Sequence, residues 1–320
     1  MLGNNKLTSW LSALLVGIVV LGLLLWLAEP AALLMQFRQA NWHWLALALV
    51  PLGIEVVFTS LRVQHCVNRP VPFSLAMYCN SLYIAWLSLL PARLGEIAGV
   101  AVFNQKLGMT VGSATASVVV QRIYDVLILA GLLVAALSQT LYGGQTGLLL
   151  ASLVLLALLI VLATLPFWLS TFARLFFTWR HVRWLKRLMY IVLQARTWYR
   201  HQSAPSAISW LAGTTLGKWS FNLVAVVLIF SAAGIDLEPG VLVTVAILMH
   251  FLGAIPIQSF GGFGAAEIGV AGILVSMHIP NDQAVAAGLL VRVVSLCFSG
   301  LFFTVCFFTL RPKPSRVQPV

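Results

Sequence analysis

Ten apolar segments, separated by short polar stretches, follow one another along this chain. They fall at about 10–28, 44–61, 74–90, 94–105, 114–138, 146–170, 207–231, 240–257, 263–279 and 283–309. A helix needs about 20 apolar residues to cross the hydrocarbon core of a bilayer, and segment 94–105 is too short to do so alone. The pattern predicts an all-α polytopic membrane protein with about eight full spans plus broken or re-entrant segments.

The composition supports this fold class. Hydrophobic residues make up 61% of the 320 residues and charged residues 8%, whereas a soluble domain carries about 25% charged residues. We therefore expect a single integral membrane domain over residues 1–320, with an uncleaved first span. The four cysteines lie in or beside apolar segments without metal-ligand spacing, so we interpret them as small buried side chains and expect no metal or cofactor.

The net charge of +11 is better explained by the loops than by a nucleic-acid partner. No acidic residue occurs between Asp125 and Asp236, and residues 171–206 carry seven lysines and arginines. Loops rich in these residues stay in the cytoplasm. We predict a basic cytoplasmic loop at 171–206, cytoplasmic N and C termini, and a location in the cytoplasmic (inner) membrane. The same loop could also lie along the inner leaflet and attract anionic headgroups.

One polar stretch, Leu90-Pro-Ala-Arg-Leu-Gly-Glu96, interrupts two apolar segments. A charge near the bilayer centre costs roughly 2.5–3.5 kcal/mol on insertion scales. Pro91 removes a backbone donor, and Gly95 permits a break in the helix. Two interpretations stay open here: a broken segment that lines a cavity inside the protein, or a short surface loop with a structural ion pair between Arg93 and Glu96.

A second stretch, Gly261-Gly-Phe-Gly-Ala-Ala-Glu267, has the same layout. In each, a break is followed by a glutamate, a turn and a span with an arginine, and the glutamate-to-arginine spacing is 26 residues in the first and 25 in the second. Five predicted crossings separate the two units, so they run through the membrane in opposite directions. This predicts an inverted-topology repeat of units 74–138 and 240–309, the arrangement of many secondary transporters. The glycines could instead serve close helix packing.

Several ionisable residues of the predicted spans must pair or face water, because the bilayer interior penalises isolated charges. Arg122 and Asp125 lie three residues apart, which suits a local ion pair. Glu96 and Glu267 have their natural partners in Arg122 and Arg292, within or across the halves. Glu55 lies in a predicted span, and Arg62 nearer its edge. A structural network and a polar cavity for a lipid headgroup or ion are both consistent with this pattern. The candidate substrate-binding residues are Arg93, Glu96, Arg122, Asp125, Gly261, Gly262, Gly264, Glu267 and Arg292.

At these residues the chain resembles the lysylphosphatidylglycerol synthase transmembrane family, whose members are also described as flippase-like integral membrane proteins. The family pattern is leucine-proline-glycine-arginine-x-glycine-glutamate, then glutamate-arginine-x-x-aspartate, then proline-glycine-glycine-x-glycine-x-x-glutamate and a later arginine. Here it corresponds to Leu90–Glu96, Gln121–Asp125, Gly261–Glu267 and Arg292. Three departures occur, namely Ala92 for glycine, Gln121 for glutamate and Ser259-Phe260 before the glycines. The loss of an acid at Gln121 weakens any proton-coupling role there.

The resemblance implies translocation of a phospholipid or handling of a lipid-linked sugar in envelope assembly. We expect a transporter of an anionic or lipid-linked headgroup rather than an enzyme. We expect no aminoacyl-transfer domain after Arg311, and the sequence contains no phosphate-binding loop for ATP. The alternatives are a polyprenyl-phosphate glycosyltransferase, for which Glu29 is the acid available in the first outer loop, and a non-catalytic accessory protein of a glycosyltransferase or synthase. For His250 we favour a core position over a proton relay.

Overall fold

The structure of the chain is a computed structural model that describes residues 37–67, 70–90, 94–178, 193, 205–254 and 263–311. Nine of the ten predicted segments correspond to helices there, and segment 10–28 lies outside the described residues. The all-α polytopic class is therefore confirmed. The helices are α3 (Trp42–His65), α4 (Phe73–Leu89), α5 (Leu94–Leu107), α6 (Val111–Tyr142), α7 (Gly144–Thr178), α9 (Pro205–Ala232), α10 (Pro239–Leu252), α11 (Ala265–Ser276) and α12 (Asn281–Leu310).

The helices fall into two length classes. Within the described residues, five stretches are long and apolar enough to cross a membrane, and they lie in α3, α6, α7, α9 and α12. Helices α5 and α10 have 14 residues each and α11 has 12, so each is about 18–21 Å long against a hydrocarbon core of about 30 Å. Helices of this length cannot cross the core alone, as expected for broken segments.

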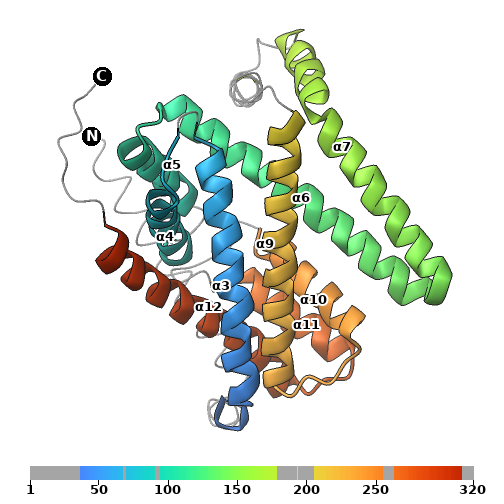
Figure 1. Cartoon of the computed structure of the whole chain (residues 1–320). Helices are drawn as coiled ribbons and strands as arrows, with labels where there is room; N and C mark the ends of the chain where they lie inside the picture. Colours follow the sequence, from blue (N-terminus) through green and yellow to red (C-terminus); the bar gives the residue numbers. More distant parts are fainter. Residues whose placement is uncertain are drawn as a thin grey trace, which may run out of the picture.

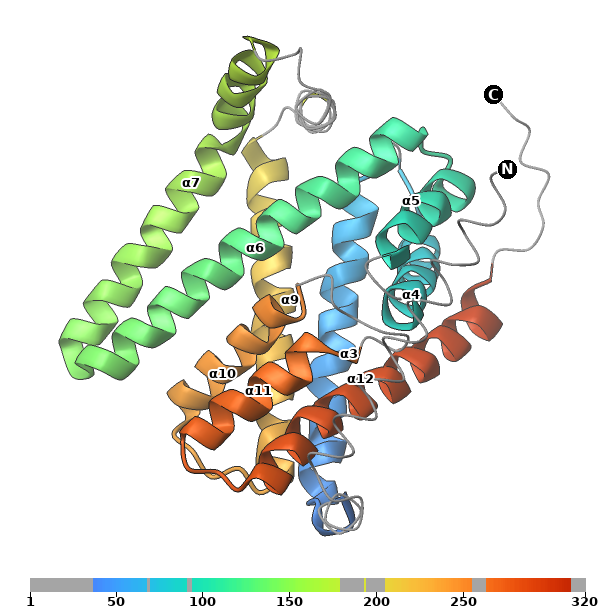
Figure 2. The same ribbon diagram turned by 180° about the vertical axis from the view of Figure 1, so that it is seen from behind.

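Helices α3 and α9 form an antiparallel pair through the middle of the molecule (Figure 1). At one end the Asn41 amide donates a hydrogen bond of 2.9 Å to the Ala232 carbonyl, and at the other the His65 and Trp210 rings lie 6.4 Å apart. The start of each helix thus lies beside the end of the other. The long helices α6 and α12 cross this pair (Figure 2).

Two short hairpins lie on opposite sides of the α3–α9 pair (Figure 2). Helix α4 packs on α5 and also on α12, while α10 packs on α11 and also on α6. Each hairpin therefore contacts the long helix that follows the other hairpin in the chain. This reciprocal packing is the kind that repeat units 74–138 and 240–309 would produce, and the repeat itself stays a prediction.

The core lies among α6, α9, α10, α11 and α12, and its largest buried side chains include Tyr124, Phe230, Ile247 and Leu274. Helix α7 packs mainly on α6, and only 12% of its Gly144–Leu162 stretch is buried. Helix α7 therefore contributes little to the core of the bundle.

The α4–α5 hairpin closes through a glycine. A Cβ atom on Gly95 would collide with the backbone of Leu87 on α4. Because a backbone cannot move aside as a flexible side chain can, only glycine allows the two helices to approach this closely. This contact fixes Glu96, the next residue, at the mouth of the hairpin.

We predict that Gly95→Ala lowers the stability of the protein by about 1–3 kcal/mol, as overpacked sites do. Gly300→Ala on α12 is the matched control, because a Cβ there meets no atom within 4 Å. Thermal unfolding in detergent, followed by tryptophan fluorescence, measures both. Equal midpoints for Gly95→Ala and Gly300→Ala would contradict this packing.

Candidate binding site

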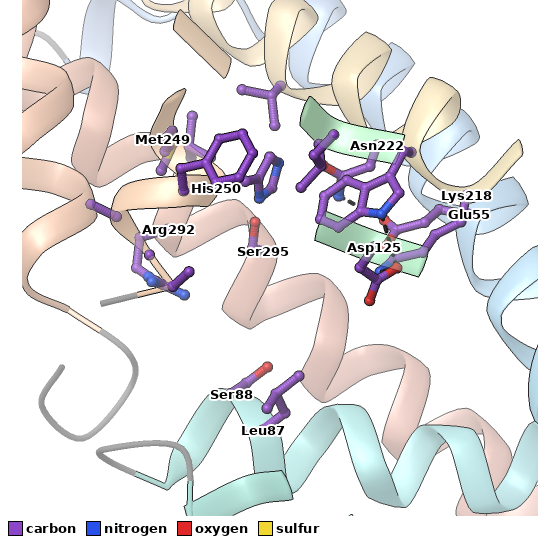
Figure 3. A pocket seen from close by; sticks show the side chains of 18 of the residues that line it. Glu55, Leu87, Ser88, Asp125, Lys218, Asn222, Met249, His250, Arg292 and Ser295 are labelled. Atoms are coloured by element: carbon purple, nitrogen blue, oxygen red, sulfur yellow. Dashed lines mark hydrogen bonds and ion pairs between the residues drawn. The ribbon is translucent and has the colours of Figure 1, made fainter. Parts of the chain in front are cut away.

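A cavity of about 350 Å³ lies in the interior of the bundle, and eight of the described helices, all except α7, contribute to its lining. Its ionisable lining residues are the acids Glu55, Glu96 and Asp125 and the cations Arg122, Lys218 and Arg292, with His250 beside them. In a molecule with so few charges, this concentration marks the cavity as the candidate site. Figure 3 shows Arg292 on one side of it and Asp125, Lys218 and Glu55 on the other, with Ser295 between.

The two short hairpins reach the cavity with their tips. Leu87 and Ser88 come from the last turn of α4 and Glu96 from the first turn of α5. In the other hairpin, the lining residues are Met249, His250 and Phe251 from the end of α10, Gly253 and Ala254 just after it, and Ala266 from the start of α11. Helix ends leave backbone groups without intrahelical partners. Ends that lie at membrane depth are tolerated where they border a polar cavity.

Asp125 binds four side chains on three helices. One carboxylate oxygen accepts hydrogen bonds from Arg62 Nη1 at 2.6 Å, Trp219 Nε1 at 2.9 Å and Lys218 Nζ at 3.1 Å. The other lies 3.3 Å from Arg122 Nη1. Asp125 is almost fully buried, so these partners replace the water that an ionised carboxylate requires. The local Arg122–Asp125 pair predicted from the sequence is confirmed, as one part of a larger network.

Arg122 connects this network to the first hairpin. Its Nε lies 3.0 Å from a carboxylate oxygen of Glu96, and its Nη2 donates a hydrogen bond of 3.0 Å to the Tyr83 hydroxyl on α4. The two side chains of the Arg122–Glu96 pair remain 30% and 24% exposed. Both therefore keep surface that faces the cavity.

Glu267 and Arg292 form the corresponding pair in the second half. Arg292 Nε donates a hydrogen bond of 2.9 Å to Glu267 Oε1, while Glu267 Oε2 accepts one of 2.8 Å from the Gly264 amide at the start of α11. The Glu267 side chain is 1% exposed and the Arg292 side chain 20%. Glu267 thus stands behind Arg292 and presents its guanidinium to the cavity. The glutamate–arginine pairing predicted from the sequence is present, within each half.

Glu55 differs from the other acids. Its Oε2 accepts a hydrogen bond of 3.0 Å from Asn222 Nδ2 on α9, and no ion pair joins it to any residue in the described part of the chain. His250 also borders the cavity, with its ring 4.7 Å from that of Trp219. Its Nε2 finds no hydrogen-bond partner among the described residues. His250 is thus a cavity-wall residue, not a fully enclosed core residue.

The predicted site residues divide into three groups. Glu96, Arg122, Asp125 and Arg292 line the cavity, whereas Glu267 and Gly264 support Arg292 from behind. Arg93, Gly261 and Gly262 lie outside the described residues, as do Ala92, Ser259 and Phe260 and most of the loop 171–206. Gln121 donates a hydrogen bond of 3.2 Å to Ser117 on its own helix and does not line the cavity.

Sequence reasoning misplaced one residue and missed others. Arg62, expected nearer the edge of its span, is 3% exposed and binds Asp125 in the interior. Lys218, Trp219 and Asn222 were not among the candidates. The sequence does contain features that indicate two of them. Lys218 is the single charge in the apolar segment 207–231, and Asn222 follows one helical turn later, on the same face.

Comparison with known proteins identifies the family. Residues 11–302 match the lysylphosphatidylglycerol synthase TM region, and the chain belongs to this family. It is a multi-pass membrane protein. No curated protein and no solved structure matches the chain.

We predict that Asp125→Asn destabilises the protein by about 3–5 kcal/mol, because it leaves the buried Arg62 and Lys218 without their counter-ion. Glu96→Gln is the matched control, since its ion pair is partly exposed and we expect it to contribute about 1 kcal/mol or less. Thermal unfolding in detergent measures the difference. Equal midpoints for the two variants would contradict the central role of Asp125.

We also predict that the cavity admits water. Cysteines introduced as Ser88→Cys and Ser295→Cys, with Cys297 changed to serine, should react with a charged, membrane-impermeant thiosulfonate. Val57→Cys is the control, because Val57 is 40% exposed on the outer surface of α3, where lipid excludes a charged reagent. Labelling of Val57→Cys as fast as Ser88→Cys and Ser295→Cys would mean that the cavity is no more hydrated than the lipid-facing surface.

Proposed function

We propose that this member of the lysylphosphatidylglycerol synthase TM family is a flippase-like transporter. It would move the polar headgroup of a phospholipid or a lipid-linked sugar across the bacterial cytoplasmic membrane. The observation that carries the proposal is the cavity itself, a polar space inside an apolar bundle, lined by three acids and three cations. Intramembrane ionisable residues that face such a space are typical of substrate pathways.

The arginines suit the anionic part of a headgroup. Arg122 and Arg292 line the cavity and keep 30% and 20% of their side-chain surface exposed. An arginine guanidinium is planar and can hold a phosphate through two parallel hydrogen bonds. Each arginine is oriented by a glutamate, Glu96 or Glu267, at the first turn of a short helix. This arrangement favours a phosphate bound in the cavity between the hairpin tips.

A purely structural ion network explains the molecule less well. Charges kept only for stability would be expected to bury one another fully, as Arg62 and Asp125 do. Arg122, Glu96 and Arg292 instead remain partly open to the cavity. The surplus of polar surface there supports a ligand.

The position of the cavity also suits transport. It lies between the tips of two hairpins on opposite sides of the α3–α9 pair. In many secondary transporters broken helices meet at a midplane site, and access alternates as one repeat moves against the other. We propose the same movement here, with the repeat units 74–138 and 240–309. Membrane lipids would be the partners, and the cytoplasmic orientation of both termini remains a prediction.

We predict that Arg122→Ala and Arg292→Ala each lower the rate of headgroup flipping about tenfold or more, since a charge-assisted hydrogen bond contributes about 1.5–3 kcal/mol. The assay follows fluorescent-headgroup lipids in proteoliposomes through quenching by an impermeant reductant. Arg122→Lys and Arg292→Lys should recover part of the rate, because they keep the charge and lose the bidentate geometry.

Lys106→Ala is the control for this series. It removes the same charge from an exposed position at the end of α5, outside the cavity, and should flip lipid at the wild-type rate. Wild-type flipping by folded Arg122→Ala and Arg292→Ala would exclude the cavity as the transport site. If substitutions in the loop 171–206 abolish function while the cavity variants keep it, the accessory role would be favoured.

A further inference from the structure

Glu55 is the cavity acid that forms no ion pair with the residues that the structure describes. Glu96, Asp125 and Glu267 each lie within ion-pair distance of a cation, at 3.0, 2.6 and 2.9 Å. The Glu55 carboxylate receives a neutral amide hydrogen from Asn222 at 3.0 Å and forms no ion pair with the described residues. An ionised carboxylate at membrane depth is expensive without a cation, and protonation removes that penalty.

The charges around Glu55 are all engaged elsewhere. Lys218 of α9 lines the same cavity, and its ammonium binds Asp125 of α6 at 3.1 Å. Arg62 of α3 also binds Asp125. The other elements that border the cavity contribute Glu96 from α5, Arg122 from α6, His250 from α10 and Arg292 from α12, and α4 contributes the neutral Ser88.

Among the described residues of the charged network, Glu55 sets the balance of charge. Without it, the described network contains the acids Glu96, Asp125 and Glu267 and the cations Arg62, Arg122, Lys218 and Arg292, which leaves one positive charge in excess. A protonated Glu55 preserves that excess, and an ionised Glu55 cancels it. Within the described network, protonation of Glu55 therefore changes the net charge from zero to one positive charge, which favours an anion.

From this placement we propose that Glu55 is a proton-binding site that couples proton movement to movement of an anionic headgroup. The inference rests on the proposed function and names the energy source of the proposed transport. A proton from water on one side binds the Glu55 carboxylate, the resulting cavity charge binds one negative headgroup, and both leave to the other side. Because coupling between two ligands is reciprocal, headgroup binding also raises proton affinity. A headgroup of one negative charge and one proton move together without net charge.

The first experiment measures proton binding without transport. Purified protein in weakly buffered detergent solution with a pH-indicator dye is saturated with short-chain phosphatidylglycerol. Wild type should take up about one proton per lipid bound at a pH where Glu55 is ionised, and Glu55→Gln, which keeps the side-chain shape, should take up none while still binding lipid. Val57→Ala on the outer surface of α3 should behave as wild type. Lipid binding without proton uptake by wild type would overturn the proposal, as would unchanged uptake by Glu55→Gln, which would point to His250.

The second experiment measures coupling in proteoliposomes. With one proton per lipid, a pH difference of one unit is worth about 1.4 kcal/mol and should support an approximately tenfold ratio of phosphatidylglycerol between leaflets. A potential set by potassium and valinomycin should leave that ratio unchanged, because no net charge moves. Glu55→Gln should let lipid equilibrate to equal amounts and no further.

The outcomes separate this inference from the proposed function. If wild type flips phosphatidylglycerol but ignores the pH difference, transport stands and the proton site fails. If wild type neither binds nor flips phosphatidylglycerol, transport of this lipid and the proton coupling built on it both fail. A ratio that follows the potential instead of the pH difference would also overturn electroneutral coupling.

Discussion

The packing of the helix bundle depends on how the charge of one buried carboxylate is compensated. Asp125 lies on α6 and is held by Arg62 of α3 and by Lys218 and Trp219 of α9. Each of these groups would be costly in the bilayer interior alone, and together they satisfy one another. The network fixes the register of the antiparallel α3–α9 pair against α6. The tips of the two short hairpins contribute to the lining of the cavity that Asp125 borders.

The cavity follows from helices that end within the membrane. Helices α5, α10 and α11 are too short to span, so their termini lie where an ordinary membrane protein has continuous helix. Polar groups at those termini need partners or water. The partly exposed Arg122–Glu96 pair and Arg292 supply a polar wall, and Glu55 adds a carboxylate without a cation among the described residues. In the proposed function, stability and ligand recognition thus use different members of one charged cluster.

The sequence predicted the fold class and most helix positions because apolar segments and bilayer thickness determine them. It also predicted that Glu96 and Glu267 pair with Arg122 and Arg292, since few other partners existed. It did not place Arg62 at Asp125, because depth in the bundle depends on how α3 packs on α9. Lys218, Trp219 and Asn222 were missed for a related reason: a single polar residue in an apolar helix shows its importance only when the partner helix is known. The symmetry of the two halves remains a prediction. The reciprocal packing, of α4 on α12 and of α10 on α6, makes this prediction more specific.

The central claim is that the cavity holds the phosphate of a lipid headgroup. A cryo-electron microscopy structure in nanodiscs that contain phosphatidylglycerol tests it most directly. We predict headgroup density inside the cavity, with phosphate oxygens about 2.7–3.2 Å from the guanidinium of Arg122 or Arg292. Lipid density confined to the outer surface of the bundle, with the cavity holding water alone, would contradict the claim and leave the charges as a structural network.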